Sequence, residues 1–156
     1  MIVKKNINIK FNKMATVYLA LGSNMGDRPA NIQKAIELLN SSKITVKKIS
    51  SIIETEPAGG PPQDKYLNGV IEVTTTLTPF ELLKTAQSIE KKLGRKKTVC
   101  NAPRPIDIDI LFYDQKKIQT PELTIPHPRM LNREFVMRPL SEIAPDLVNE
   151  LTHARR

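Results

Sequence analysis

Residues 104–111 read RPIDIDIL, and the regular alternation of apolar and charged residues in this stretch predicts a β-strand. Side chains of a strand point alternately to its two faces, so the three isoleucines share one face while Asp107 and Asp109 share the other. The isoleucine face is suited to a hydrophobic core. The two carboxylates are then neighbours on the outer face, about 7 Å apart along the backbone.

The paired aspartates call for a positive charge nearby, because Asp is disfavoured in strands and like charges on one face repel. A divalent cation meets this requirement, and carboxylate oxygens favour magnesium or manganese. Two ions about 3.5–4 Å apart would suit a displacement at phosphorus. The alternative is an amphipathic strand whose acidic outer face is paired with local lysines.

The sequence on the amino-terminal side of this strand predicts further strands and helices. Residues 16–21 and 66–76 are β-prone, and residues 44–54 are rich in Ile and Val. Apolar residues recur at helical spacing over 29–41 and 79–93. The order β-α-β-β-α-β predicts an α+β fold, a ferredoxin-like three-layer sandwich with additional short elements after the last core strand. One face or edge of the sheet would stay uncovered and carry a site.

Capping and turn residues delimit these elements. Asp27 is an expected N-cap, and Gly94 is suited to the position just after a helix. Residues 56–65 hold three prolines and two glycines and therefore predict a loop. Gly22 is expected to permit a positive φ in a tight turn at 22–24.

Length and composition restrict the class of protein. The 156 residues suit one domain, which we expect over 14–156, after a basic extension at 1–13. No apolar stretch approaches the roughly 20 residues that a membrane span needs. The single cysteine, Cys100, excludes an internal disulfide and a cysteine-rich zinc site. We therefore expect a cytoplasmic protein whose metal chemistry rests on carboxylates.

Basic residues gather just before the aspartate strand. The formal net charge is +8, and the segment 91–104 contains no acid but six basic residues: Lys91, Lys92, Arg95, Lys96, Lys97 and Arg104. A cationic loop beside a metal pair is what a polyphosphate needs, although such a loop can also be merely solvated. No Gly-x-x-x-x-Gly-Lys-Ser/Thr loop is present, so an ATP site must be built from side chains.

The segment after residue 120 adds further candidates. His127 stands between two prolines, which hold its backbone extended, and it is either a phosphate donor or a surface histidine. Arg133 next to Phe135 can combine charge with ring stacking, although Phe135 also suits a core.

Four stretches together resemble 6-hydroxymethyl-7,8-dihydropterin pyrophosphokinase of folate synthesis. They are LALGSNMGDR, ETEPAGGPPQDKYLNGV, APRPIDIDILFY and IPHPRMLNREFVMRPLSEIAPDL, and the likeness covers about residues 16–148. The resemblance implies a ferredoxin-like fold and transfer of the terminal pyrophosphoryl unit of ATP to the pterin hydroxymethyl group, with release of AMP. It also implies two Mg²⁺ ions, small-molecule substrates only, and a monomer.

The resemblance assigns roles to individual residues. Asp107 and Asp109 would hold the metal, and Arg95, Lys97 and Arg104 would join them in catalysis by gathering phosphates. The nucleotide would contact Gln87, Glu90, Lys97, Arg104, Ile110, Thr124, His127 and Arg133. The pterin would contact Thr55, Pro57, Ala58, Gly59, Tyr66, Asn68 and Phe135. Cys100, Asn101 and Ala102 stand where many relatives carry a basic residue, an aromatic residue and glycine.

Two alternatives remain at this point. The net charge is compatible with an RNA-binding module on the same fold, but such modules stack bases on aromatic residues, and only 4% of this chain is aromatic. A phosphate hydrolase could use the same metal pair and would consume ATP without any pterin.

Overall fold

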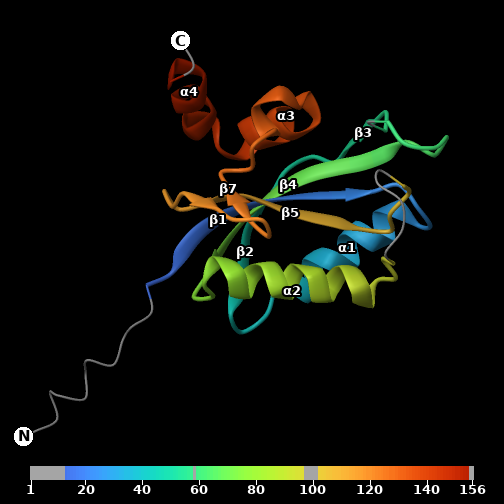
Figure 1. Ribbon diagram of the computed structural model, residues 1–156, viewed down its shortest axis with the longest axis horizontal. Coiled ribbons are helices and arrows are strands. Elements are labelled where there is room, and N and C mark those ends of the chain that lie inside the picture. Colours follow the sequence, from blue (N-terminus) through green and yellow to red (C-terminus); the bar gives the residue numbers. More distant parts are fainter. Residues whose placement is uncertain (1–12, 58, 97–101, 155–156) are drawn as a thin grey trace, which may run out of the picture.

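The computed structural model describes residues 13–57, 59–96 and 102–154. The extension expected at 1–13 therefore lies, except for Lys13, outside the described residues. Figure 1 shows a central sheet with helices α1 and α2 on one side and helices α3 and α4 on the other. In chain order the elements are β1 (Ala15–Ser23), α1 (Arg28–Leu39), β2 (Ile44–Ile49), β3 (Ile53–Thr55), β4 (Tyr66–Thr75), α2 (Pro79–Lys92), β5 (Asp107–Tyr113), β6 (Ile118–Gln119), β7 (Thr124–Ile125), the 3-10 helix η2 (Met130–Asn132), α3 (Glu134–Ile143) and α4 (Pro145–Ala154).

The main sheet is antiparallel, with strands in the order β2-β4-β1-β5 and with β3 also paired to β4. The strand expected over 44–54 is therefore interrupted. At the interruption Ser50 bonds both ways with Val70, since its backbone N–H donates to the Val70 carbonyl and its hydroxyl accepts from the Val70 N–H, each at 2.9 Å. The Ser50 hydroxyl thus takes the place of a backbone acceptor for the Val70 N–H, and the regular pairing of β2 with β4 ends here.

The first core lies between the sheet and helices α1 and α2. It contains Val17, Leu19 and Leu21 of β1, all at most 1% exposed, and the buried faces of the two helices. Asp27 caps α1 by accepting a hydrogen bond from the Ala30 N–H at 3.1 Å, as expected. Gly94 follows α2 with a φ of +102°, a conformation that favours glycine. These residues fix where α1 begins and where α2 ends.

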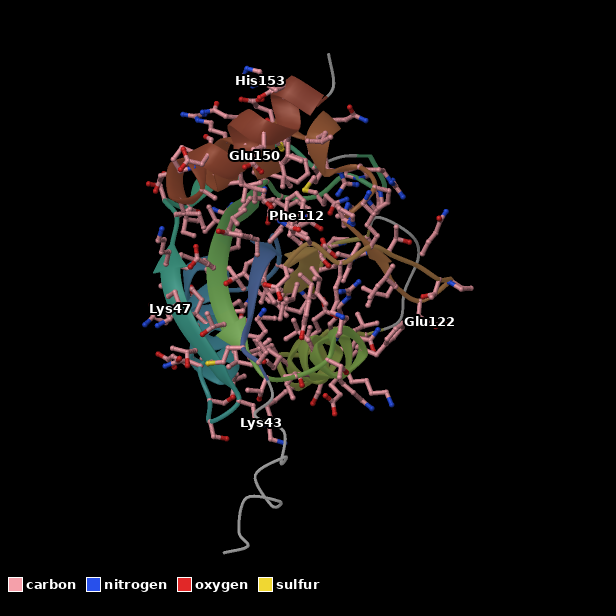
Figure 2. The ribbon with its side chains drawn as sticks, turned by 90° about the vertical axis from the view of Figure 1, so that its left-hand side faces the viewer. Lys43, Lys47, Phe112, Glu122, Glu150 and His153 are labelled. Atoms are coloured by element: carbon pink, nitrogen blue, oxygen red, sulfur yellow. The ribbon has the colours of Figure 1, made fainter. Side chains whose placement is uncertain are left out.

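The second core lies on the opposite face, under α3 and α4. Val70, Leu111, Phe112 and Leu140 are buried there, and Figure 2 shows Phe112 between the sheet and the C-terminal helices. The expectation of one uncovered face is therefore only partly right. The segment expected to form short elements contains two ten-residue helices, and Pro139 inside α3 interrupts the helical signal that would have predicted them.

The uncovered part of this second face is the end where β1 finishes and β5 begins. None of the helices in the described residues is long and apolar enough to cross a bilayer. Within these ranges the architecture is a mixed α/β arrangement of a five-stranded antiparallel sheet, a two-stranded antiparallel sheet formed by β6 and β7, and four α-helices.

Candidate active site

Three adjacent strands place Asn68, Gly22 and Asp107 in one row across the open end of the sheet. Gly22 of β1 pairs with Asn68 of β4 on one side and with Asp107 of β5 on the other. Neighbouring strands lie about 4.8 Å apart, so the backbones of the two outer residues are roughly 10 Å apart. Two residues earlier on β1, Ala20 pairs in the same way with Asp109. The floor of the site is thus built from very small side chains.

Gly22 is required by a close approach and not by its backbone angles. It lies within β1 and is not among the positive-φ glycines of the described residues, so the expectation of a tight turn there is wrong. A Cβ atom at this position would lie 2.9 Å from Oδ1 of Asn68 and 3.4 Å from Cδ1 of Tyr66. Any larger residue would push these two side chains out of place.

A cavity of about 300 Å³ stands above this floor. Its walls come from β1, β4, β5, the loop before β4 and the segment 127–136. Eleven of the residues predicted from the sequence line it together: Thr55, Pro57, Gly59, Tyr66, Asn68, Arg104, Asp107, Asp109, His127, Arg133 and Phe135. The fold therefore brings the expected metal, phosphate and pterin residues to one place.

Arginines surround the first carboxylate of the pair. Oδ1 of Asp107 accepts hydrogen bonds from Nη1 of Arg95 at 3.0 Å and from Nη1 of Arg104 at 3.4 Å. The same Nη1 atom of Arg95 lies 2.6 Å from Oε2 of Glu90. Glu90 is 8% exposed and also accepts the backbone N–H of Ile108 at 2.8 Å. Two guanidinium groups thus neutralise Asp107 and Glu90, and no lysine does so among the described residues.

The second carboxylate has no such partner. Within the described ranges, Asp109 accepts no hydrogen bond and forms no ion pair. Burial, together with the nearby negative charges of Asp107 and Glu90, raises the pKa of Asp109 to about 7. A buried carboxylate beside two others is stabilised by a cation, which is the property expected of a metal ligand.

The donor set is suited to a hard divalent cation that keeps other ligands. No group of three or more histidine, cysteine, aspartate or glutamate side chains that could hold a metal is found in the part of the chain that the structure describes. The aspartate pair alone would leave most coordination positions of Mg²⁺ to water and substrate phosphates, which is how this ion usually binds in phosphate-transferring sites. The residues present therefore fit such an ion.

The other side of the cavity combines an oriented amide with two aromatic rings. The amide Nδ2 of Asn68 donates to Oγ1 of Thr55 at 2.5 Å, which fixes the orientation of the amide. Cζ of Arg133 lies 5.6 Å from the ring centroid of Phe135, a cation–π distance that agrees with the pairing expected from the sequence. Burial raises the pKa of Tyr66, and the Asp107 charge adds to this rise, so the phenol stays protonated.

His127 reaches the cavity through a backbone contact. Its N–H donates to the carbonyl of Leu111 on β5 at 3.0 Å. Burial lowers the pKa of the His127 imidazole, and the positive charges of Arg133 and Arg129 lower it further, so the ring is neutral near pH 7. Of the two alternatives for this residue, its half-buried position against the cavity favours a ligand contact over a free surface histidine.

Four predicted nucleotide residues do not line the cavity. Gln87 is exposed on α2, Glu90 is buried against Arg95, Ile110 is 4% exposed in the first core, and Thr124 is half-buried in β7. Their roles stay predictions. Lys97 and Ala58, like Cys100 and Asn101, lie outside the described residues, whereas Ala102 is buried at 4% exposure.

Sequence reasoning missed Asn24, which ties two walls of the cavity together. Its side chain accepts the Arg104 N–H at 2.8 Å and donates to Oε1 of Gln63 at 2.5 Å and to the carbonyl of Asp64 at 3.1 Å. The residue is 2% exposed. A polar residue in an apparent turn gives no sign of burial, because its partners are about 40 and 80 positions away along the chain. Glu56, Gln63 and Arg129 also line the cavity and were not predicted.

Taken together, the paired carboxylates, the converging arginines and the ring-binding wall have the features of an enzyme that transfers a phosphate-containing group to a flat heterocycle. Residues 18–145 match the family described as 7,8-dihydro-6-hydroxymethylpterin-pyrophosphokinase (HPPK), and the chain belongs to that family.

Similar proteins come from distant organisms. A 2-amino-4-hydroxy-6-hydroxymethyldihydropteridine pyrophosphokinase of Bacillus subtilis is 46% identical over 138 residues, which cover 88% of this chain and 83% of that protein. The enzyme of the same description from Aquifex aeolicus is 44% identical over 138 residues, covering 88% and 86% respectively. The folic acid synthesis protein fol1 of Schizosaccharomyces pombe is 44% identical over 143 residues, covering 91% of this chain but 19% of that longer protein.

Solved structures agree on the fold. A crystal structure of an HPPK-DHPS in complex with substrates superposes with a TM-score of 0.62 over 85% of this chain and 40% of that one, at 16% identity. At that identity the likeness speaks for the fold alone. The sequence matches confirm the predicted family and the predicted pyrophosphokinase activity in folate synthesis, and they favour it over the RNA-binding and hydrolase alternatives.

Proposed function

We propose that this cavity binds ATP and 6-hydroxymethyl-7,8-dihydropterin side by side, and that Asp107 and Asp109 hold two Mg²⁺ ions between them. The observation that carries the proposal is the row Asn68–Gly22–Asp107. It sets a ring-reading amide and a metal-binding carboxylate roughly 10 Å apart over a floor of very small side chains. A bicyclic ring can lie along this row, with one edge at Asn68 and its hydroxymethyl group directed towards the carboxylates.

The reaction then needs positioning more than acid–base chemistry. The pterin hydroxyl oxygen attacks the β-phosphorus of ATP, the bond from that phosphorus to the oxygen bridging it to the α-phosphate breaks, and AMP leaves. Bound metal would neutralise phosphate charge and align the two reacting oxygens. The hydroxyl proton passes to solvent or phosphate, and we assign no side chain as its base.

The chain's own residues supply the orientation and the remaining positive charge. Arg104, together with Arg95 and Lys97 from the loop before it, would contact the phosphates, because guanidinium groups bind phosphate oxygens in pairs. Arg133 and the neutral His127 would contact the nucleotide from the opposite wall. Gln87, Glu90, Ile110 and Thr124 remain predicted nucleotide contacts. Their positions outside the cavity wall make them the weaker part of this assignment.

The pterin would be read by polar groups and enclosed by rings. Asn68, oriented by Thr55, presents amide atoms to the ring edge. Phe135 and Tyr66 would cover the ring faces, and the loop residues Pro57, Ala58 and Gly59 would close the remaining side. An apolar slot with a few fixed polar groups is the usual form of such a pocket.

The wider assignments rest on the same observations. We infer a ferredoxin-like arrangement, which the antiparallel order β2-β4-β1-β5 supports. We also infer that residues 14–156 act as one domain and as a monomer without nucleic acid, as the family resemblance implies. A cytoplasmic location is supported by the single cysteine, which suits a reducing compartment.

The direct test is to incubate the protein with ATP, magnesium and 6-hydroxymethyl-7,8-dihydropterin and to separate the nucleotide products. AMP that forms only when both pterin and metal are present is the expected result. ADP as product, or nucleotide loss without pterin, would contradict the proposed reaction and favour a hydrolase on the same residues.

A further inference from the structure

Arg95 occupies an unusual position between two carboxylates of different kinds. Its Nη1 atom lies 2.6 Å from Glu90 and 3.0 Å from Asp107. Glu90 is a buried residue of the helix, whereas Asp107 lines the cavity and is a proposed metal ligand. One guanidinium group therefore spans from the protein interior to the point where a metal ion would bind.

Glu90 holds this arginine in place. The Glu90 side chain is 10% exposed and is fixed by the N–H of Ile108 at 2.8 Å. A carboxylate at this depth is costly without a cationic partner, and within the described residues Arg95 is its only ion-pair partner. The ion pair with Glu90 therefore helps to hold Arg95 beside Asp107, in addition to the attraction of Asp107 itself.

The effect on Asp107 is that its charge is already neutralised. Both Arg95 and Arg104 donate to the same oxygen, Oδ1. A divalent ion approaching Asp107 must compete with two guanidinium groups and is repelled by both. The carboxylate pair is then a poor metal site as it stands, although its donor atoms suit the ion.

Nucleotide phosphates would remove this obstacle. They offer the arginines a stronger and geometrically matched partner, since a guanidinium group can bind two phosphate oxygens at once. They also bring oxygen ligands for the metal. Departure of the arginine and arrival of the ion are then two parts of one exchange.

We propose that Arg95, anchored by Glu90, holds the place of the divalent cation at Asp107, so that the metal binds this chain together with the nucleotide and not before it. The proposal rests on the proposed function, because it takes Asp107 as a metal ligand. It goes further in assigning an order of binding and a positioning role to Glu90.

The experiment is to titrate the complete protein with Mn²⁺ in the absence of nucleotide. Electron paramagnetic resonance measures the concentration of free Mn²⁺ at each step. Arg95→Ala should tighten Mn²⁺ binding roughly tenfold relative to the unsubstituted protein, the scale of removing one directly coupled charge. Lys96→Ala is the matched control: it removes the same charge from the next residue, whose side chain is exposed and has no ion pair among the described residues. It should change the affinity less than about twofold.

Two further measurements fix the direction of the effect. With a non-hydrolysable ATP analogue present, the unsubstituted protein should bind Mn²⁺ at least roughly tenfold more tightly than without it. The advantage of Arg95→Ala should then vanish or reverse, because the arginine now serves the phosphates. Glu90→Gln keeps an acceptor for the Ile108 N–H but removes the charge that anchors Arg95 beside Asp107. Mn²⁺ alone should therefore bind this variant more tightly than the unsubstituted protein, though less tightly than it binds Arg95→Ala.

The inference is overturned if Mn²⁺ binds the unsubstituted protein equally well with and without the analogue, or if Arg95→Ala behaves like Lys96→Ala. Neither result would touch the proposed function, which AMP formation tests separately. Absence of Mn²⁺ binding under every condition would instead contradict the metal assignment itself. Circular dichroism and a thermal melt identify any variant that fails to fold. If Arg95→Ala does not fold, the Mn²⁺ affinity of Glu90→Gln, whose side chain has the same shape as glutamate, tests the proposal instead.

Discussion

Replacing Asn24 by alanine would remove three side-chain hydrogen bonds that join two walls of the cavity. The Asn24 amide accepts from the Arg104 N–H at 2.8 Å and donates to Gln63 and to the Asp64 carbonyl at 2.5 and 3.1 Å. Asn24 itself is 2% exposed, so its own side chain is shielded from water. Both the stability of the fold and the geometry of the cavity should suffer.

The magnitude follows from the number of bonds. Each buried hydrogen bond contributes about 1 kcal/mol, so the free energy of unfolding should fall by about 3 kcal/mol. In a chain of this size that corresponds to a loss of roughly 6–12 °C in Tm. Asn24→Asp should be at least as harmful, because a carboxylate can still accept from Arg104 but cannot donate to the oxygens of Gln63 and Asp64. Gln63 could turn its amide to help only by giving up its bonds to the carbonyls of Gly59 and Pro61.

The assay is urea unfolding at fixed pH, together with kcat/KM for the pterin. Asn40→Ala is the matched control, since Asn40 is exposed and its side chain accepts one hydrogen bond, from the Val46 N–H at 3.1 Å. It should cost about 0.5–1 kcal/mol and leave kcat/KM unchanged. Asn24→Ala should also lower kcat/KM for the pterin roughly tenfold, as the loop before β4 loses its tie. Equal costs for the two alanine variants would refute the role we assign to Asn24.

Three further predictions concern the cavity itself. Asp109→Asn should lower AMP formation roughly a hundredfold or more, because a metal ligand is lost. Tm should be unchanged or higher, because the substitution removes a buried charge that has no ion pair among the described residues. An active variant would contradict metal binding at Asp109. Asn68→Ala should raise KM for the pterin roughly tenfold with little change in KM for ATP, and equal losses for both substrates would count against its role as reader of the ring. In a ¹H–¹⁵N NMR titration, His127 should have a pKa below its ordinary value of 6.5. Arg133→Ala should raise the pKa of His127, since the Arg133 charge disfavours the protonated ring. A pKa above 6.5 in the unsubstituted protein would refute the argument from burial.

The fold was largely predictable because its strands carry a clear alternation and its helices carry clear caps. Val17, Leu19 and Leu21 repeat every second residue and all enter the first core. Asp27 caps the beginning of α1, and Gly94 follows the end of α2 with a positive φ. These signals are local, so a single sequence contains them.

What escaped prediction depends on contacts between distant segments. Gly22 was expected in a turn, but the reason for glycine there is the Asn68 side chain on a neighbouring strand, 46 positions later. Asn24 is buried only because Arg104 and Gln63 return to it. Glu90 recurs at helical spacing with Ala86 and Leu93, but nothing nearby in the sequence shows that its carboxylate binds Ile108 and Arg95. The residue types therefore indicated the chemistry of the site, whereas the contacts that hold its side chains in place could not be predicted from the sequence.

The aspartate strand itself shows why strict alternation cannot hold along its whole length. Up to Ile110 the pattern obeys the sequence, but the register with β1 then shifts by one residue between Leu19 and Tyr18. Leu111 and Phe112 consequently both enter the second core, while Tyr113 returns to the first and donates its hydroxyl hydrogen to the Leu77 carbonyl.

If these residues alternated strictly and formed no bulge, Tyr113 would lie on the same face as Asp107 and Asp109, and the strand could not both direct its carboxylates into the cavity and place Tyr113 in the first core. The extra residue in the bulge, Leu111, also contacts the segment after β7. The Leu111 oxygen accepts the His127 N–H at 3.0 Å, and this contact ties the segment carrying His127 to the cavity wall beside the carboxylates. A departure from the pattern that predicted the strand is therefore what completes the site built on it.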